Sequence, residues 1–220
     1  MKKITIALFM LPCFAAHADE FQYQKIGPYV YAGAGYANTS FDGNQIVATT
    51  QSAGTKTVLS SSNDGANPAA YRLRGGYQIT NNLGVELGYT SVGQINFSET
   101  WIGKGVGAAN NYANASGTMK IYDAVGTAST SIYDGIYLMG KLGVSRLTFS
   151  GSATDIYSGN GMVFGSSGSD TKTGITVGVG LKYYLDESAS IRLDVDRYQV
   201  PSGDFISAFE IFSAGIQYQF

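Results

Sequence analysis

Eight charged residues fall on the polar side of a two-residue alternation in this sequence, and their spacing suggests that they act together. In a strand that alternates polar and apolar residues, all polar side chains point to one face of the sheet. If the sheet closes into a small barrel, that face is the interior, where charges must be paired and hydrogen-bonded. We predict an interior network that holds the barrel together; a gated or selective conduit is the functional alternative. The network comprises Arg72, Arg74, Glu86, Lys141, Lys182, Arg192, Asp194 and Asp196.

The residues that most often activate nucleophiles or bind metals are nearly absent. The chain has one cysteine and one histidine, Cys13 and His17, and both lie in an N-terminal segment that we expect to be removed. General-base and nucleophilic catalysis near neutral pH most often recruit an imidazole or a thiol. Serines are plentiful, but no activating partner can be named for them. We therefore expect no enzymatic activity, no metal and no cofactor.

The segment 94–119 contains two features that invite a binding role. The glycines of GKGVG, residues 103–107, have the wrong spacing for a nucleotide-binding loop, and no strand-to-helix pattern surrounds them. Trp101 is the only tryptophan and lies in the stretch SETWIGKG. It either packs within a loop or contacts a partner, since tryptophan is a common energetic anchor of interfaces.

The N-terminus has the pattern of a secretory signal peptide. Lys2 and Lys3 precede an apolar stretch over 4–14, which is too short to span a bilayer, and small residues at Ala16 and Ala18 suit cleavage. We expect residues 1–18 to be removed and 19–27 to form a short polar lead. Loss of the two lysines changes the formal net charge from −2 to −4. A mildly acidic chain without a basic run is not expected to bind nucleic acid.

Eight segments alternate in the manner of strands. The clearest is the last, in which Phe212, Ile216, Tyr218 and Phe220 share one face and the chain ends on an aromatic residue. In a soluble sandwich, which is the alternative, this strand would be an exposed and aggregation-prone edge. In an outer-membrane barrel it is the closing strand, with its apolar face against lipid. The predicted strands cover 28–38, 69–80, 83–93, 120–129, 135–146, 173–185, 189–199 and 207–220.

Short and long connections alternate along the chain, which is typical of outer-membrane barrels with short periplasmic turns and long outer loops. Long loops are predicted at 39–68, 94–119 and 147–172, and a short one at 200–206. After the signal segment no apolar run is long enough for a membrane helix, so only a closed barrel could cross a bilayer. We predict an all-β protein whose residues 28–220 form an eight-stranded antiparallel up-and-down transmembrane β-barrel.

Aromatic residues are placed where the two membrane boundaries should lie, since rings with a polar tip suit that interface. A ligand-binding aromatic site is the alternative. The predicted periplasmic belt comprises Tyr29, Tyr77, Tyr183, Tyr184, Tyr218 and Phe220, and the predicted outer belt comprises Tyr36, Tyr71, Tyr89, Tyr198 and Phe209.

Several stretches resemble the strands of small OmpA-like outer-membrane proteins. They are GPYVYAGAGYANTSF, NNLGVELGYTSVG, IYLMGKLGVSR, VGVGLKYYL, IRLDVDRY and the final GIQYQF. The resemblance implies an outer-membrane location with both termini periplasmic and the loops extracellular. It also implies that the assembly machinery reads the C-terminal strand. Because the chain ends at Phe220, we expect no peptidoglycan-binding domain.

Three functions remain open. The resemblance and the long polar loops favour a monomeric barrel that displays loops to a host surface ligand, of an adhesion, colonisation or serum-resistance type. The second possibility is a narrow OmpW-like channel for small or apolar solutes, and the third is a structural envelope component. In each case the barrel would be surrounded by outer-membrane lipid.

Overall fold

Alternation of polar and apolar residues folds the chain into antiparallel strands. The computed structural model describes residues 24–38, 56–62, 67–103, 110–157, 162–200 and 208–220. None of these residues forms a helix long and apolar enough to cross a membrane. The strands are β1 (Gly27–Asn38), β2 (Lys56–Ser62), β3 (Ala69–Gln78), β4 (Leu83–Gly103), β5 (Asn110–Tyr133), β6 (Ile136–Tyr157), β7 (Met162–Tyr184), β8 (Ala189–Gln199) and β9 (Ala208–Gln219).

The sheet closes on itself. Around the ring the order is β4-β3-β1-β9-β8-β7-β6-β5, and the pairing of β5 with β4 completes it. The seam joins the first and last strands, with Gly33 opposite Gly215. This confirms the predicted eight-stranded antiparallel up-and-down barrel. The ninth strand, β2, lies outside the ring and pairs only with the far end of β4.

The ring has an apolar outside and a mostly polar inside. Leu73, Leu87 and Leu142 each expose more than 60% of their surface on the outer face. Their strand neighbours Arg72, Glu86 and Lys141 are buried in the interior. This is the arrangement expected for strands that meet lipid on one side.

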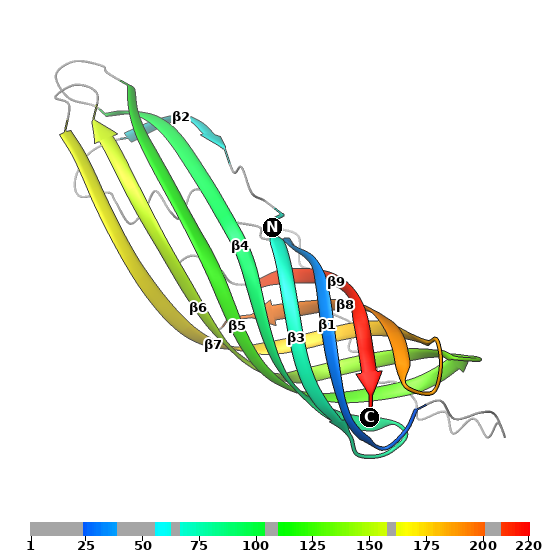
Figure 1. The fold of residues 1–220 in the computed structure, drawn as a ribbon. Coiled ribbons are helices and arrows are strands. Elements are labelled where there is room, and N and C mark those ends of the chain that lie inside the picture. The colour runs from blue at the N-terminus through cyan, green and yellow to red at the C-terminus, as the bar shows by residue number, and fades with distance from the viewer. Residues whose placement is uncertain (1–23, 39–55, 63–66, 104–109, 158–161, 201–207) are drawn as a thin grey trace, which may run out of the picture.

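Four strands are about twice as long as a barrel of this kind needs. A membrane-spanning strand takes roughly 9–11 residues, and β1, β3, β8 and β9 have 12, 10, 11 and 12. By contrast, β4 to β7 have 21, 24, 22 and 23 residues. Figure 1 shows these four strands continuing together well past the ends of their neighbours, with β2 beside β4.

We call this extension the projecting sheet; it comprises 56–62, 95–103, 110–119, 147–157 and 162–174. It corrects the predicted loops at 94–119 and 147–172, which are mostly paired strands. Part of the predicted loop at 39–68 is β2. The polar and small residues of these segments hide the strand pattern, while the ladder that begins in the barrel continues through them.

A β-bulge marks the place where β4 leaves the ring. The register with β5 shifts between Val92 and Ile95, just where the pairing with β3 ends at Val92. Beyond the bulge, β4 pairs with β2 instead, from Ser98 onward. Bulges increase local twist and redirect a strand, so this one lets β4 leave the ring and enter the projecting sheet.

The tight turns at the opposite end are held by local hydrogen bonds. Asp186 Oδ1 accepts the backbone N–H groups of Ser188 and Ala189, both at 2.7 Å. These two bonds lower the pKa of the Asp186 carboxyl because they favour its charged form. Gly135, between β5 and β6, has a φ of 70°, which favours glycine in this turn.

A close backbone approach at Gly143 provides a test of the packing between β5 and β6. A Cβ placed there would overlap the Ala124 carbonyl oxygen and the Val125 Cα, whereas at Gly140 it would lie 3.9 Å from the nearest atom. Gly143→Ala should therefore lower the free energy of unfolding by about 2 kcal/mol, with Gly140→Ala nearly neutral. Urea unfolding of the barrel refolded in lipid vesicles measures both, and equal midpoints would contradict the proposed crowding.

The remaining predictions about chain organisation fall outside the described residues. These are the signal segment 1–18, the lead up to residue 23, the connections within 39–55 and 63–66, and nearly all of the loop at 200–206.

Candidate functional site

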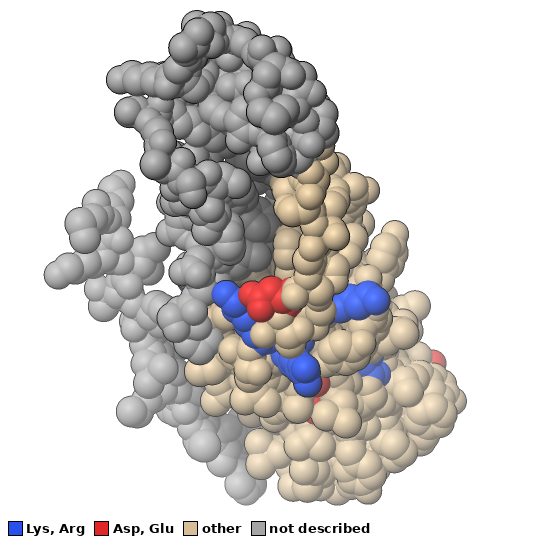
Figure 2. Space-filling view, turned by 90° about the vertical axis from the view of Figure 1, so that its left-hand side faces the viewer, with Lys and Arg blue, Asp and Glu red and all other residues tan. Residues whose placement is uncertain are grey.

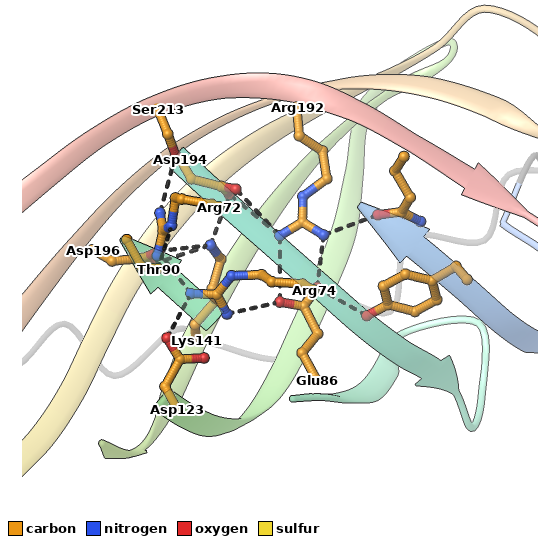
Figure 3. Close-up of polar contacts among 12 residues, drawn as sticks. Arg72, Arg74, Glu86, Thr90, Asp123, Lys141, Arg192, Asp194, Asp196 and Ser213 are labelled. Carbon is orange, nitrogen blue, oxygen red and sulfur yellow. Dashed lines mark hydrogen bonds and ion pairs between the residues drawn. The ribbon is translucent and has the colours of Figure 1, made fainter. Parts of the chain in front are cut away.

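A layer of ion pairs crosses the interior of the barrel (Figure 3). Its members come from five of the eight ring strands, β3, β4, β5, β6 and β8, because each strand points alternate residues inward. The structure brings together seven of the eight predicted charges and adds Asp123. Every side chain in these ion pairs has zero exposure. The layer comprises Arg72, Arg74, Glu86, Asp123, Lys141, Arg192, Asp194 and Asp196.

Glu86 on β4 is one centre of this layer. Its carboxylate lies 3.1 Å from Arg74 Nη1 and 2.6 Å from Arg192 Nη1, and it accepts a 2.9 Å hydrogen bond from the Tyr29 hydroxyl. Three strands other than its own therefore converge on one carboxylate. Such charge-assisted bonds are among the strongest in proteins.

Asp194 and Asp196 on β8 form the second centre. Asp196 pairs with Arg72, with Arg74 at 3.3 Å and with Lys141 at 3.1 Å. Asp194 lies 2.8 Å from the same Lys141 amine and 3.3 Å from Arg192. Shared cations thus link the two centres across the barrel.

Asp123 on β5 was missed by the sequence analysis. Its carboxylate lies 3.1 Å from Arg74 and accepts a 3.0 Å hydrogen bond from the Tyr198 hydroxyl. The residues at the adjacent inward positions, Ile121 and Val125, are also buried. Two apolar inward neighbours removed the polar-inside pattern that would have identified Asp123.

Lys182 is the one predicted charge that stays apart from the layer. It is buried on β7, and no carboxylate among the described residues lies within ion-pair distance. Its amine instead faces the rings of Tyr29 and Tyr184, 5.7 and 5.5 Å from their centroids. The four carboxylates of the layer are matched by four other basic side chains, so none of them is left to balance Lys182.

Apolar side chains fill the interior at the projecting-sheet end. The buried cluster includes Met119, Ile121, Leu147, Phe209 and Ile211, with Phe149 packed against it. Tyr198 belongs to this cluster and also contacts the layer through its hydroxyl. An apolar region therefore lies beyond the ion pairs.

The predicted aromatic belts are wrong for four residues, which point inward. Tyr29, Tyr184, Tyr198 and Phe209 expose at most 3% of their surface. Tyr29 and Tyr198 donate hydrogen bonds to layer carboxylates, and Tyr198 stacks on Phe209. Alternate residues of a strand point to opposite sides of the sheet, and these four residues occupy positions that point into the barrel. The remaining predicted belt residues lie on the outer face.

The closing strand, β9, presents its apolar face to the outside of the barrel, as predicted. Ile216, Tyr218 and Phe220 are exposed on the outside, and Phe212 stacks on Tyr36 with ring centroids 5.2 Å apart.

Trp101, expected in a loop, lies in strand β4, where its backbone is opposite Val58 and Asn111. Its side chain lies outside the described part of the structure.

The carboxylates of the ion-pair layer all have basic partners. Each carboxylate is engaged by cations, and no group of three or more His, Cys, Asp or Glu among the described residues is arranged to hold a metal ion. Outside the barrel, a shallow polar depression lies on the projecting sheet between Ser116, Thr118, Ser150 and Ser152.

Comparisons with known proteins identify the architecture. The family model described as outer membrane protein beta-barrel domain matches residues 5–220. OprG from Pseudomonas aeruginosa, a solved outer-membrane protein, is 16% identical over 91% of this chain and 99% of its own, with a TM-score of 0.52. The attachment invasion locus protein Ail of Yersinia pestis is 18% identical over 89% and 100%, with a TM-score of 0.49. No relative was found among curated proteins.

Proposed function

The chain belongs to the outer membrane protein beta-barrel domain family, and from this membership we propose that the barrel anchors a surface-interaction protein in the outer membrane. In this proposal the projecting sheet faces the outside and both termini face the periplasm. The protein acts as a monomer that binds a host or environmental surface ligand, in an adhesion, colonisation or serum-resistance role. The proposal includes no enzymatic activity and no signal segment in the mature chain.

The projecting sheet is the observation that carries this proposal. Strands β4 to β7 have roughly twice the length needed to cross a membrane. Short turns would suffice to close the barrel, so the additional length is available for contacts. Side chains on a rigid sheet also lose less conformational entropy when they bind a partner than side chains on a mobile loop do.

An open edge of the projecting sheet favours recognition of another polypeptide. Along β7, pairing with β8 begins at Ile175, so the described residues of 162–174 pair with β6 alone. On the opposite side of the projecting sheet, β2 pairs with β4 and is itself the edge strand. Unpaired backbone groups on an edge strand can accept an additional strand from a partner.

The filled interior weighs against the channel alternative. The ion-pair layer has no exposed side chain, and apolar residues pack beyond it. A conducting path would require several buried charges to separate, which costs several kcal/mol.

We also propose that the closing strand, with Phe220 at its end, is the element that the barrel-assembly machinery reads.

Trimming the projecting sheet tests this function without disturbing the ring. Asn96 is opposite Ser116 and Gly151 is opposite Gly168, so two-residue Asn-Gly turns can replace 97–115 and 152–167 in register. We expect the doubly trimmed barrel to lose adhesion to epithelial cells and matrix-coated wells. Bacteria expressing full-length and trimmed barrels at matched surface levels would be compared.

Single trims of each hairpin serve as matched controls and identify which half of the sheet binds. Heat-dependent electrophoretic mobility would verify that every variant is folded. Unchanged adhesion of the doubly trimmed barrel, together with conductance of the full-length protein in planar bilayers, would instead favour the channel.

A further inference from the structure

Two cations on the outer face of the barrel are explained neither by the interior layer nor by surface ion pairs. Lys120 on β5 and Arg146 on β6 point outward and are exposed. Other basic residues with described side chains are buried inside or, like Lys25, Lys172 and Arg197, lie within ion-pair distance of a carboxylate. Within the described part of the chain, Lys120 and Arg146 are thus the exposed cations without an anionic partner.

The two cations lie at the boundary of the lipid-facing surface. On the same outer face, Val144 precedes Arg146 by two residues and is 58% exposed; Tyr122 follows Lys120 by two and is 52% exposed. Tyr122 packs against Tyr89, with ring centroids 5.2 Å apart. Tyrosines of this kind mark the interface between hydrocarbon and headgroups. Figure 2 shows basic side chains across the middle of one face, with acidic side chains among them, above a surface made mostly of uncharged residues.

The register places the two cations close enough to share a ligand. Lys120 is opposite Thr148, and Arg146 is opposite Tyr122, so the cations are diagonal neighbours on adjacent strands. Diagonal positions are roughly 7–8 Å apart, a distance that long lysine and arginine side chains can close around one anionic group. Arginine offers two parallel donors that match phosphate oxygens.

Hydroxyl groups continue this surface into the projecting sheet. Thr148 lies 3.2 Å from Thr171, Ser150 donates to Ser169 at 3.3 Å, and Ser116 lies 3.4 Å from Ser152. The shallow depression between Ser116, Thr118, Ser150 and Ser152 lies on this face, beyond the cations. Hydroxyls can donate and accept hydrogen bonds, which suits the hydroxyl groups of a sugar.

We propose that Lys120 and Arg146 form a binding site for the phosphate of a phosphorylated glycolipid in the surrounding leaflet, with its sugar against the hydroxyl surface. The chemistry follows from position: acyl chains would cover Val144 and Tyr122, the phosphate would meet the cations, and the sugar would lie beyond them. Assignment to the outer leaflet rests on the orientation proposed above, whereas binding itself does not.

Binding of lipid A to the refolded full-length barrel in neutral detergent micelles tests this site. The probes are diphosphorylated lipid A and the same lipid with both phosphates removed. We expect Lys120→Gln with Arg146→Gln to weaken binding of the phosphorylated lipid about thirtyfold, and each single substitution about fivefold. Arg146→Lys should retain most of the binding.

The matched control is Arg197→Gln with Glu210→Gln, which removes an exposed ion pair of 3.0 Å without changing net charge. It should bind like the wild type. Equal affinity for the two lipids, or unchanged affinity of the Lys120 and Arg146 variants, would overturn the site. Either result would leave the adhesion proposal intact, and failure of the trimming experiment would leave this site intact.

Discussion

Replacing Glu86 by alanine should lower the free energy of unfolding of the barrel by about 4–5 kcal/mol. The carboxylate engages Arg74, Arg192 and the Tyr29 hydroxyl inside the ring. Its removal leaves two guanidinium groups with less compensation in a site without solvent exposure. An uncompensated buried charge is far more costly than a lost surface contact. Urea unfolding of the refolded barrel in lipid vesicles measures this loss.

A second glutamate provides the control for this experiment. Glu187 lies in the exposed turn between β7 and β8 and pairs with Lys25 at 2.8 Å. Glu187→Ala should change the free energy of unfolding by less than about 1 kcal/mol, because exposed pairs are screened and weakly coupled. If the two alanine variants unfolded at the same urea concentration, the ion-pair layer would not be a source of stability.

The two buried lysines should respond in different ways to the same substitution. Lys141→Met removes a cation shared by Asp194 and Asp196, and we expect it to lower the free energy of unfolding by about 3 kcal/mol. Lys182→Met removes a buried amine that has no described carboxylate partner. Its loss relieves desolvation but removes two ring contacts, so a change of about 1 kcal/mol or less is expected.

The comparison between these two lysines separates the contribution of ion pairing to stability from the contribution of burial. Both side chains are almost fully buried, with exposures of 3% for Lys141 and 2% for Lys182. Unfolding midpoints of the two methionine variants, measured under identical lipid conditions, give the answer. Equal destabilisation would mean that the ion pairs of Lys141 contribute no more to stability than the ring contacts of Lys182 do.

Local alternation was enough to predict the barrel and most of its interior charges. Each strand in the membrane-spanning part has lipid on one side, so apolar and polar residues must alternate, as around Leu73 and Glu86. Because parity along a strand decides which side a residue occupies, seven of the eight layer members follow from the amino-acid pattern alone. The same rule predicted the outward face of the closing strand.

Where lipid does not cover one face, the alternation disappears and the sequence is ambiguous. The projecting sheet is rich in serine, threonine and glycine, so its strands resembled loops, although the ladder from the barrel continues through them. Asp123 was hidden for a related reason, since the interior around Ile121 and Val125 is apolar.

The fold class, the ring of strands and the inward position of most charges can be read from the amino-acid order, because each depends on a local two-residue period. Three relations required the folded barrel: which charges are paired, that Lys182 has no described carboxylate partner, and that Lys120 lies beside Arg146. These relations depend on register between strands distant in the chain, such as Tyr122 opposite Arg146. A one-residue shift of register would exchange the inner and outer faces of a strand, so only the closed barrel specifies them.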